Sequence, residues 1–248
     1  MSVYTDLTGH SALITFSKPP VNALDKLTLQ ELTDHIRAAG EHPDIKVIVL
    51  QSEGKTFCAG ADFSELISLE DHDEAVDFFM GFGRVINAMR KAPKPVIVRM
   101  QGKAVGGGVG IVAAADIAFS VADAALKLSE LSIGIGPYVI APAIIRKSGK
   151  AFFQEMAFQP WRWFSAFDAQ KRGLIATVSE NKKTMDESID RFVSAYEKTD
   201  AEAIARLKRE AWKDAENWDA LLREQAEKSA ALLLREPVKN LLRELKNK

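Results

Sequence analysis

Short apolar runs alternate with segments of helical periodicity through the first half of the chain, and this alternation restricts the fold most strongly. The runs predict strands at 12–16, 46–50, 96–100, 117–120 and near 125–128. Helical spacing of apolar residues predicts a helix over 25–39, with Gly40 as its stop, and a longer helical segment over 63–90 that the acidic stretch 70–74 interrupts. Strands that alternate with helices are typical of βαβ units around a buried sheet. We therefore predict an α/β protein.

The last quarter of the chain has a different character. From Met185 onward Glu, Lys, Arg, Ala and Leu dominate, and Asp200 stands where the N-cap of one helix is expected. We place a boundary near residues 194–200. The prediction is an α/β core over 1–195 followed by a helical region over 196–248.

Composition excludes several classes of function. The 248 residues carry 33 Lys+Arg against 34 Asp+Glu, so no net field would attract a nucleic acid or a membrane surface. A single cysteine, Cys58, fits a reducing compartment, and residues 1–10 show no secretory pattern, so we expect a cytoplasmic protein. No apolar stretch is long enough to span a bilayer, and no His/Cys/Asp cluster has metal-ligand spacing, so we expect neither a membrane span nor a metal.

Three segments of small or acidic residues follow predicted strands. They are 57–63, the glycine triplet 106–108, and 128–131, which contains Glu130. Glycine lets a backbone approach a ligand closely, and the free N–H groups in the first turn of a helix act as donors to negative charge. Two such turns from neighbouring strands could direct two N–H groups at one oxygen and stabilise an enolate or a tetrahedral oxyanion.

Each segment alone has a plainer interpretation. A glycine triplet before a helix more often serves close packing or phosphate binding, although neither a Walker A nor a GxGxxG motif is present. Glu130 by itself is more often a surface or capping carboxylate. We interpret Cys58 as a small buried apolar residue.

Four motifs in order resemble the enoyl-CoA hydratase/isomerase (crotonase) family along nearly the whole chain. Segment 18–24 (KPPVNAL) resembles the family's RPxxNAL, and 54–62 (GKTFCAGAD) resembles its GxxF(C/S)AGAD loop. Segment 101–108 (QGKAVGGG) resembles NGxAxGGG, and 114–117 (AADI) resembles AxCD(I/L), with Ala115 in place of the usual cysteine. Four motifs at family spacing are a specific signal, whereas any one alone would be weak.

The resemblance implies roles for individual residues. Ala61 and Gly107 would donate their N–H groups to the thioester oxygen, and Glu130 would be the catalytic acid/base beside it. Four further positions would lie along the CoA groove, largely through their backbone: Val21, Ala23, Ala59 and Asp62.

Two departures from the family pattern bear on the reaction. Hydratases of the family usually carry a second glutamate where this chain has Gly110, which favours isomerisation of a 3-enoyl to a 2-enoyl thioester by one base. Segment 134–140 departs from the usual PGxGG run, and its Tyr138 is a candidate for narrowing the acyl end of the pocket. The same segment resembles the methylglutaconyl-CoA hydratase branch, which favours hydration, so the two departures disagree.

The resemblance therefore implies an enzyme acting on acyl-CoA thioesters through an enolate, either hydrating a 2-enoyl-CoA or shifting a double bond. The alternatives are a decarboxylase or thioesterase of the same fold, or a catalytically weak acyl-CoA-binding relative. The implied architecture is a spiral of ββα units with a C-terminal helical region that mediates trimerisation. A homotrimer or homohexamer is implied, with no cofactor beyond the CoA of the substrate.

Overall fold

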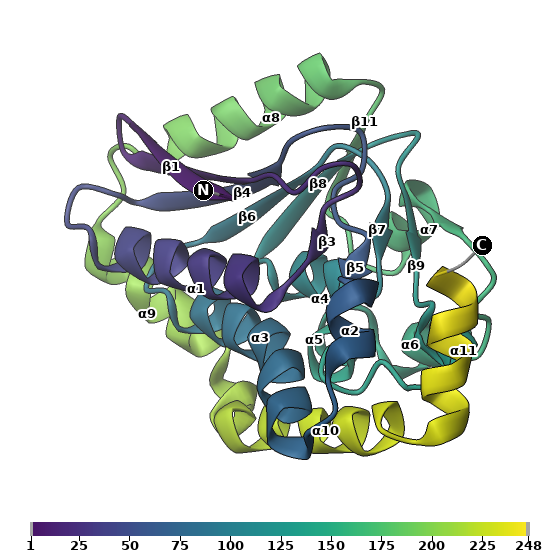
Figure 1. The fold of residues 1–248 in the computed structure, drawn as a ribbon. Helices are drawn as coiled ribbons and strands as arrows, with labels where there is room; N and C mark the ends of the chain where they lie inside the picture. The colour runs from purple at the N-terminus through teal and green to yellow at the C-terminus, as the bar shows by residue number, and fades with distance from the viewer. Residues whose placement is uncertain (1, 247–248) are drawn as a thin grey trace.

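The computed structural model describes residues 2–246, and a six-stranded sheet forms its centre (Figure 1). The strands stand in the order β1-β2-β4-β6-β8-β11; β1 and β2 are antiparallel, and all the other neighbours are parallel. Their bounds are β1 (Val3–Thr8), β2 (Ser11–Phe16), β4 (Val47–Ser52), β6 (Val96–Met100), β8 (Ile117–Val121) and β11 (Thr177–Ser179). The central strands β4 and β6 are buried almost throughout, as parallel strands covered on both faces must be.

The long strands β2, β4, β6 and β8 each lead into a short strand that leaves the main sheet. The short strands form two small sheets, one of β3 (Ala23–Leu24) with β5 (Gly60–Ala61), and one of β7 (Ala104–Val105), β9 (Ala125–Lys127) and β10 (Phe164–Ser165). A helix or 3₁₀ turn then returns the chain to the next long strand. This repeat of long strand, short strand and helix is the predicted spiral of ββα units.

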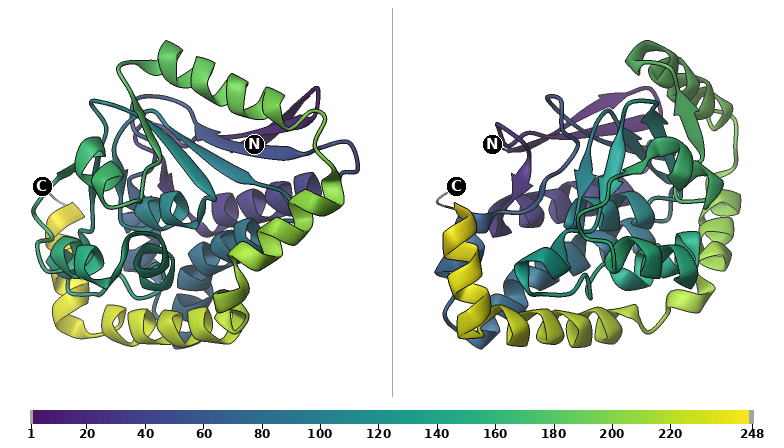
Figure 2. Two further views of the ribbon diagram at one scale, coloured as in Figure 1. Left: turned by 180° about the vertical axis from the view of Figure 1, so that it is seen from behind. Right: turned by 90° about the vertical axis from the view of Figure 1, so that its right-hand side faces the viewer.

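The helices cover the two faces of the main sheet unequally. Figures 1 and 2 show α8 alone on one face, with α1, α3 and α4 on the other and α10 beyond α3. The helix bounds are α1 (Lys26–Glu41), α2 (Phe63–Ser68), α3 (His72–Lys91), α4 (Gly107–Ala114), η1 (Glu130–Ile133), α5 (Ala141–Ser148), α6 (Lys150–Ala157), α7 (Ala166–Lys171), α8 (Lys182–Ala195), α9 (Ala201–Ala211), η2 (Lys213–Ala215), α10 (Trp218–Leu233) and α11 (Glu236–Lys246). Among the described residues, no helix is long and apolar enough to cross a membrane.

Local capping explains where the helices of the first half begin and end. The acidic stretch does interrupt the 63–90 segment, because Asp71 accepts the N–H groups of Asp73 and Glu74 and so starts α3 anew after α2. The prediction that Gly40 stops the first helix was wrong. Gly40 is buried inside α1, where a β-carbon would stand 3.6 Å from Pro93, and the helix continues to Glu41.

Several elements were not revealed by the sequence patterns. They are the edge strands β1 and β11, and the short helices α5, α6 and α7 of the second half. The helical character after residue 185 is confirmed, although α8 begins earlier, at Lys182. Asp200 is the N-cap of α9, and its carboxylate accepts the Ala203 N–H at 2.8 Å.

One partly buried carboxylate ties the C-terminal helices to the sheet. Asp116, just before β8, accepts the Val96 N–H at 2.7 Å and the Trp212 Nε1–H at 2.9 Å, and it pairs with the Lys208 ammonium. Lys208 is 6% exposed and also donates to the Met89 carbonyl at 2.9 Å. The C-terminal region is therefore anchored to β6 and β8 by a charge pair whose ammonium group is buried and whose carboxylate is partly buried.

We expect Asp116→Ala to destabilise the protein by about 3–5 kcal/mol, because it leaves the Lys208 charge buried without its partner. Urea unfolding followed by circular dichroism measures this loss. Glu202→Ala, which breaks exposed pairs with Arg206 and Arg209 on the same helix α9, should cost far less, because solvent screens exposed charges. Equal losses in the two variants would contradict the anchoring role of Asp116.

Candidate functional site

The turns that follow β4, β6 and β8 meet at the carboxyl ends of these strands, where open α/β sheets usually hold their ligands. A pocket opens there between β5, α2, α3, the start of α4, η1 and α10. The polar side chains of its lining are those of Ser129, Glu130, Tyr138 and Ser229, and the other lining residues are apolar or glycine. The full lining is Ala59, Gly60, Ala61, Phe63, Leu66, Phe79, Phe82, Val105, Gly106, Gly107, Ser129, Glu130, Ile133, Ile135, Gly136, Pro137, Tyr138, Val139, Ile140 and Ser229.

The N–H of Ala61 points away from its sheet partner. In the β3–β5 pair Ala61 stands opposite Leu24, and the next residue, Asp62, donates its N–H to the Leu24 carbonyl at 3.0 Å. Successive N–H groups of an extended strand point to opposite sides. The Ala61 N–H therefore points away from β3 and is free to bind a ligand in the pocket that Ala61 lines.

The N–H of Gly107 is a donor of the first turn of α4. Gly106 precedes it with φ +52°, a conformation that side chains rarely adopt, and accepts the N–H groups of Val109 and Gly110. The first N–H groups of a helix have no partner within it, and the helix dipole adds positive potential there.

These two donors lie on adjacent backbones. A β-carbon at Gly60 would stand 3.1 Å from the Val105 carbonyl oxygen and 3.8 Å from the Gly107 nitrogen. A side chain at Gly60 would be strained by the backbone φ of +89° and would crowd this approach of β5 to the start of α4. The arrangement can hold one oxyanion between two backbone N–H groups.

Glu130 is the carboxylate beside this pair of donors. It is the first residue of η1, and its Oε1 would lie 2.8 Å from a β-carbon at Gly106. Its Oε2 is buried and has no hydrogen-bond partner among the described residues. Burial raises the pKa of Glu130 from its ordinary 4.5 to about 7, because the charged form loses its hydration. A carboxylate with a pKa near neutrality can both take and return a proton.

The position of the expected second glutamate is closed. A β-carbon at Gly110 would lie 2.3 Å from Cγ2 of Ile140, so the side chain of Ile140 fills the space that a longer residue would enter. Among the pocket-lining residues, Glu130 is the only carboxylate and Tyr138 the only other titratable side chain. The chemistry available above the oxyanion donors is thus that of a single acid/base.

The structure brings together five of the residues singled out from the sequence. Ala59, Ala61, Gly107, Glu130 and Tyr138 all line the pocket, and the Tyr138 ring packs where a side chain at Gly136 would otherwise lie.

The other three candidates lie outside the pocket lining. Val21 is exposed, and Ala23 pairs with Gly60 in the small sheet beside the pocket. Asp62 caps α2 by accepting the Ser64 N–H at 2.8 Å and pairs with Lys18 at 3.3 Å. All three border the strand that carries the Ala61 donor, where a CoA groove was expected, and their contact with CoA stays a prediction.

The sequence patterns missed the apolar wall of the pocket. Phe79, Phe82 and Ile140 line it, and Ser229 reaches it from α10, more than 90 residues along the chain from Glu130. The phenylalanines stand at helical spacing in α3, but that spacing cannot separate a pocket residue from a core residue.

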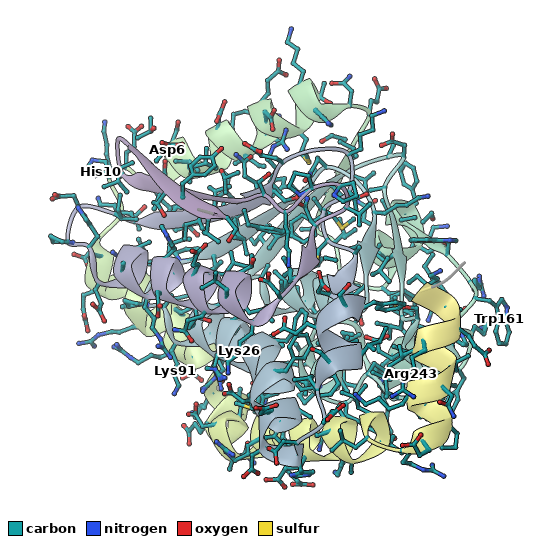
Figure 3. The ribbon with its side chains drawn as sticks, in the orientation of Figure 1. Asp6, His10, Lys26, Lys91, Trp161 and Arg243 are labelled. Carbon is teal, nitrogen blue, oxygen red and sulfur yellow. The ribbon has the colours of Figure 1, made fainter. Side chains whose placement is uncertain are left out.

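Cys58 and the tryptophans lie outside the site. Cys58 is fully buried, as interpreted from the sequence, and burial raises its thiol pKa to about 12. Trp161 is 72% exposed and projects from the edge of the molecule (Figure 3). Within residues 2–246, no group of three or more His, Cys, Asp or Glu is placed to hold a metal ion.

The raised pKa of Glu130 has a consequence for stability. Between pH 4.5 and about 7 the folded protein retains a proton that the unfolded chain releases, so stability falls as pH rises through this range. Glu130→Gln cannot ionise, and we expect it to be more stable than wild type by on the order of 2 kcal/mol at pH 8, with the difference vanishing toward pH 4.5. Unfolding curves from pH 4.5 to 8 test this expectation. The exposed Glu202→Gln should show no such trend between pH 6 and 8.

Comparison with known proteins agrees with this geometry. A model of the enoyl-CoA hydratase/isomerase family matches residues 9–235. A (7aS)-7a-methyl-1,5-dioxo-2,3,5,6,7,7a-hexahydro-1H-indene-carboxyl-CoA hydrolase of Rhodococcus jostii is 36% identical over 121 residues, 49% of this chain and 47% of that protein. A probable enoyl-CoA hydratase of Bacillus subtilis is 32% identical over 51% of this chain and 49% of that protein. The chain thus spans about half the length of these curated relatives.

Two further similarities extend over more of the chain. The mitochondrial Delta(3,5)-Delta(2,4)-dienoyl-CoA isomerase of Homo sapiens is 28% identical over 66% of this chain and 53% of that protein. The crystal structure of an enoyl-CoA hydratase from Bacillus halodurans superimposes with a TM-score of 0.92 at 23% identity, covering 98% of this chain and all of that one, which establishes the fold. With a family model that matches more than half of its residues and this fold, the chain belongs to the enoyl-CoA hydratase/isomerase family.

Proposed function

We propose that this protein isomerises a 3-enoyl-CoA to a 2-enoyl-CoA, with Glu130 as the single acid/base. The observation that carries the proposal is the closed position at Gly110, where Ile140 occupies the space of a second carboxylate. Moving a double bond needs one group that takes a proton and returns it elsewhere, whereas adding water also requires a group that orients and activates the water. The names of several relatives and the resemblance of segment 134–140 keep hydration as the second candidate.

The proposed reaction follows from the groups in the pocket. The Ala61 and Gly107 N–H groups bind the thioester oxygen. The Glu130 carboxylate removes a proton from C2, and the electron pair moves into the thioester to give a dienolate whose oxyanion the two N–H groups stabilise. The protonated Glu130 then delivers the same proton to C4, and the double bond re-forms between C2 and C3. No atom is gained or lost.

Glu130→Gln should lower kcat for isomerisation by about 10²–10⁴-fold, because the amide cannot accept the C2 proton. Binding of a saturated acyl-CoA should persist, since the two backbone donors remain. The absorbance of the conjugated thioester product reports turnover, and calorimetry reports binding. Undiminished turnover in this variant would disprove the role of Glu130, and loss of binding as well would indicate structural damage instead.

The closed position can be opened by a double substitution. Gly110→Glu alone should disturb the fold, since its β-carbon would collide with Ile140. Gly110→Glu combined with Ile140→Ala should provide a second carboxylate and raise hydration of crotonyl-CoA at least about tenfold above the Ile140→Ala single variant. The Gly110→Ala/Ile140→Ala pair is the matched control without a carboxylate. If the wild-type protein hydrates crotonyl-CoA faster than it isomerises a 3-enoyl-CoA, the isomerase assignment fails.

The remaining expectations belong to this proposal. We infer a cytoplasmic homotrimer or homohexamer that needs no cofactor beyond the CoA of its substrate and binds no nucleic acid. The family resemblance supports the assembly, and the near-neutral charge balance supports the absence of a polyanionic partner. Light scattering on the purified protein would separate a trimer from a hexamer.

A further inference from the structure

The last helix, α11, packs against two elements that wall the pocket. It contacts α2, which follows directly on the Ala61 donor, and η1, which begins with Glu130. Among the elements of residues 2–246, α11 is the principal packing partner of both. The helix α2 has six residues and η1 has four, so both are too short to be stable without a packing partner.

The contact with α2 is made by a buried ammonium group. Lys239 is 5% exposed, and its Nζ donates to the carbonyls of Leu66 and Ile67, each at 3.1 Å, and to that of Leu69. These carbonyls belong to the last turn of α2 and its cap, where the helix cannot satisfy them itself. Burial lowers the pKa of Lys239, Arg243 lowers it further, and Glu70 and Glu236 raise it.

The contact with η1 is made by the neighbouring residue. Val238 is 6% exposed, and its Cγ2 would lie 2.8 Å from a β-carbon at Gly134. Gly134 ends η1 with φ +80°, and the next residue, Ile135, donates its N–H to the carbonyl of Glu130 at 3.1 Å. Val238 therefore packs against the turn whose hydrogen bond fixes the backbone of Glu130.

We propose that α11 is a clamp that sets the distance between the two pocket walls, with Lys239 and Val238 as positioning residues for the oxyanion donor and for Glu130. Adjacent residues of one helix hold the two walls, so a displacement of α11 moves both. The clamp rests on the proposed function only for its effect on catalysis, because the packing itself needs no substrate.

The clamp also keeps water away from Glu130. No charged side chain shares the pocket with Glu130, and Tyr138 is the other titratable group there, so burial controls its protonation. Loosening η1 admits water, which stabilises the carboxylate. In a plot of kcat/KM against pH, the rising limb follows ionisation of the base. The midpoint of this limb then moves from about pH 7 toward pH 4.5.

The test uses Lys239→Met, which keeps most of the unbranched side chain but removes the ammonium group, and the milder Val238→Ala. Both variants should raise KM for a 3-enoyl-CoA roughly tenfold or more, as expected when hydrogen bonds of a charged group are lost or a wall shifts. Both should shift the rising limb to lower pH. Hydrogen exchange should accelerate in residues 62–69 and 129–135 together, while the strands 47–52 and 96–100 keep their protection.

Matched controls separate the clamp from general damage. Lys228→Met removes an exposed ammonium on α10, and Val193→Ala trims a partly buried valine of α8 on the far face of the sheet; neither should move the limb. Lys239→Arg, which retains a cationic donor, should restore most of the protection of 62–69. Faster exchange confined to 236–246, or an unmoved limb with normal KM, would overturn the proposal. If the wild-type protein has no isomerase activity, the exchange measurement still decides on the clamp, and only the proposed function fails.

Discussion

The close approach of two backbones underlies the whole site. Strand β5 and the start of α4 come so near that a β-carbon at Gly60 would crowd the Val105 carbonyl, and one at Gly108 would lie 2.7 Å from Cβ of Cys58. Glycine loses more conformational entropy on folding than other residues, and it stands at these two positions because a side chain would be strained at Gly60 and would collide with Cys58 at Gly108. The same contact brings the backbones of Ala61 and Gly107 to one pocket, so the packing of the core and the construction of the site are one constraint.

Burial then gives the pocket a carboxylate that is suited to acid/base chemistry. The Glu130 carboxylate lies against Gly106, no cation is among the described residues that line its pocket, and burial raises its pKa to about 7. This arrangement costs stability above pH 4.5 and prepares a group that exchanges protons at neutral pH. A carboxylate in water would keep its ordinary pKa and stay ionised at neutral pH. The apolar walls from α2, α3 and η1 thus raise the pKa of Glu130 by excluding water.

The C-terminal region connects to the core more closely than its sequence suggests. Its composition indicated a separate helical part, yet Lys208 pairs with Asp116 beside the sheet, Ser229 lines the pocket, and Lys239 caps α2. Each contact joins residues about 90 or more positions apart. Periodicity reports only which face of a helix is apolar, not which distant element that face meets.

The sequence by itself determined the strand–helix alternation, the two glycine-containing turns and Glu130, because apolar periodicity and the demand for small residues are local properties. The family motifs added the pairing of Ala61 with Gly107. Only the tertiary structure decided that Ile140 fills the space beside Gly110, that α3 supplies the apolar wall, and that α11 holds α2 and η1 together. These features arise where side chains from distant segments compete for the same volume, and close packing resolves that competition only in the folded state.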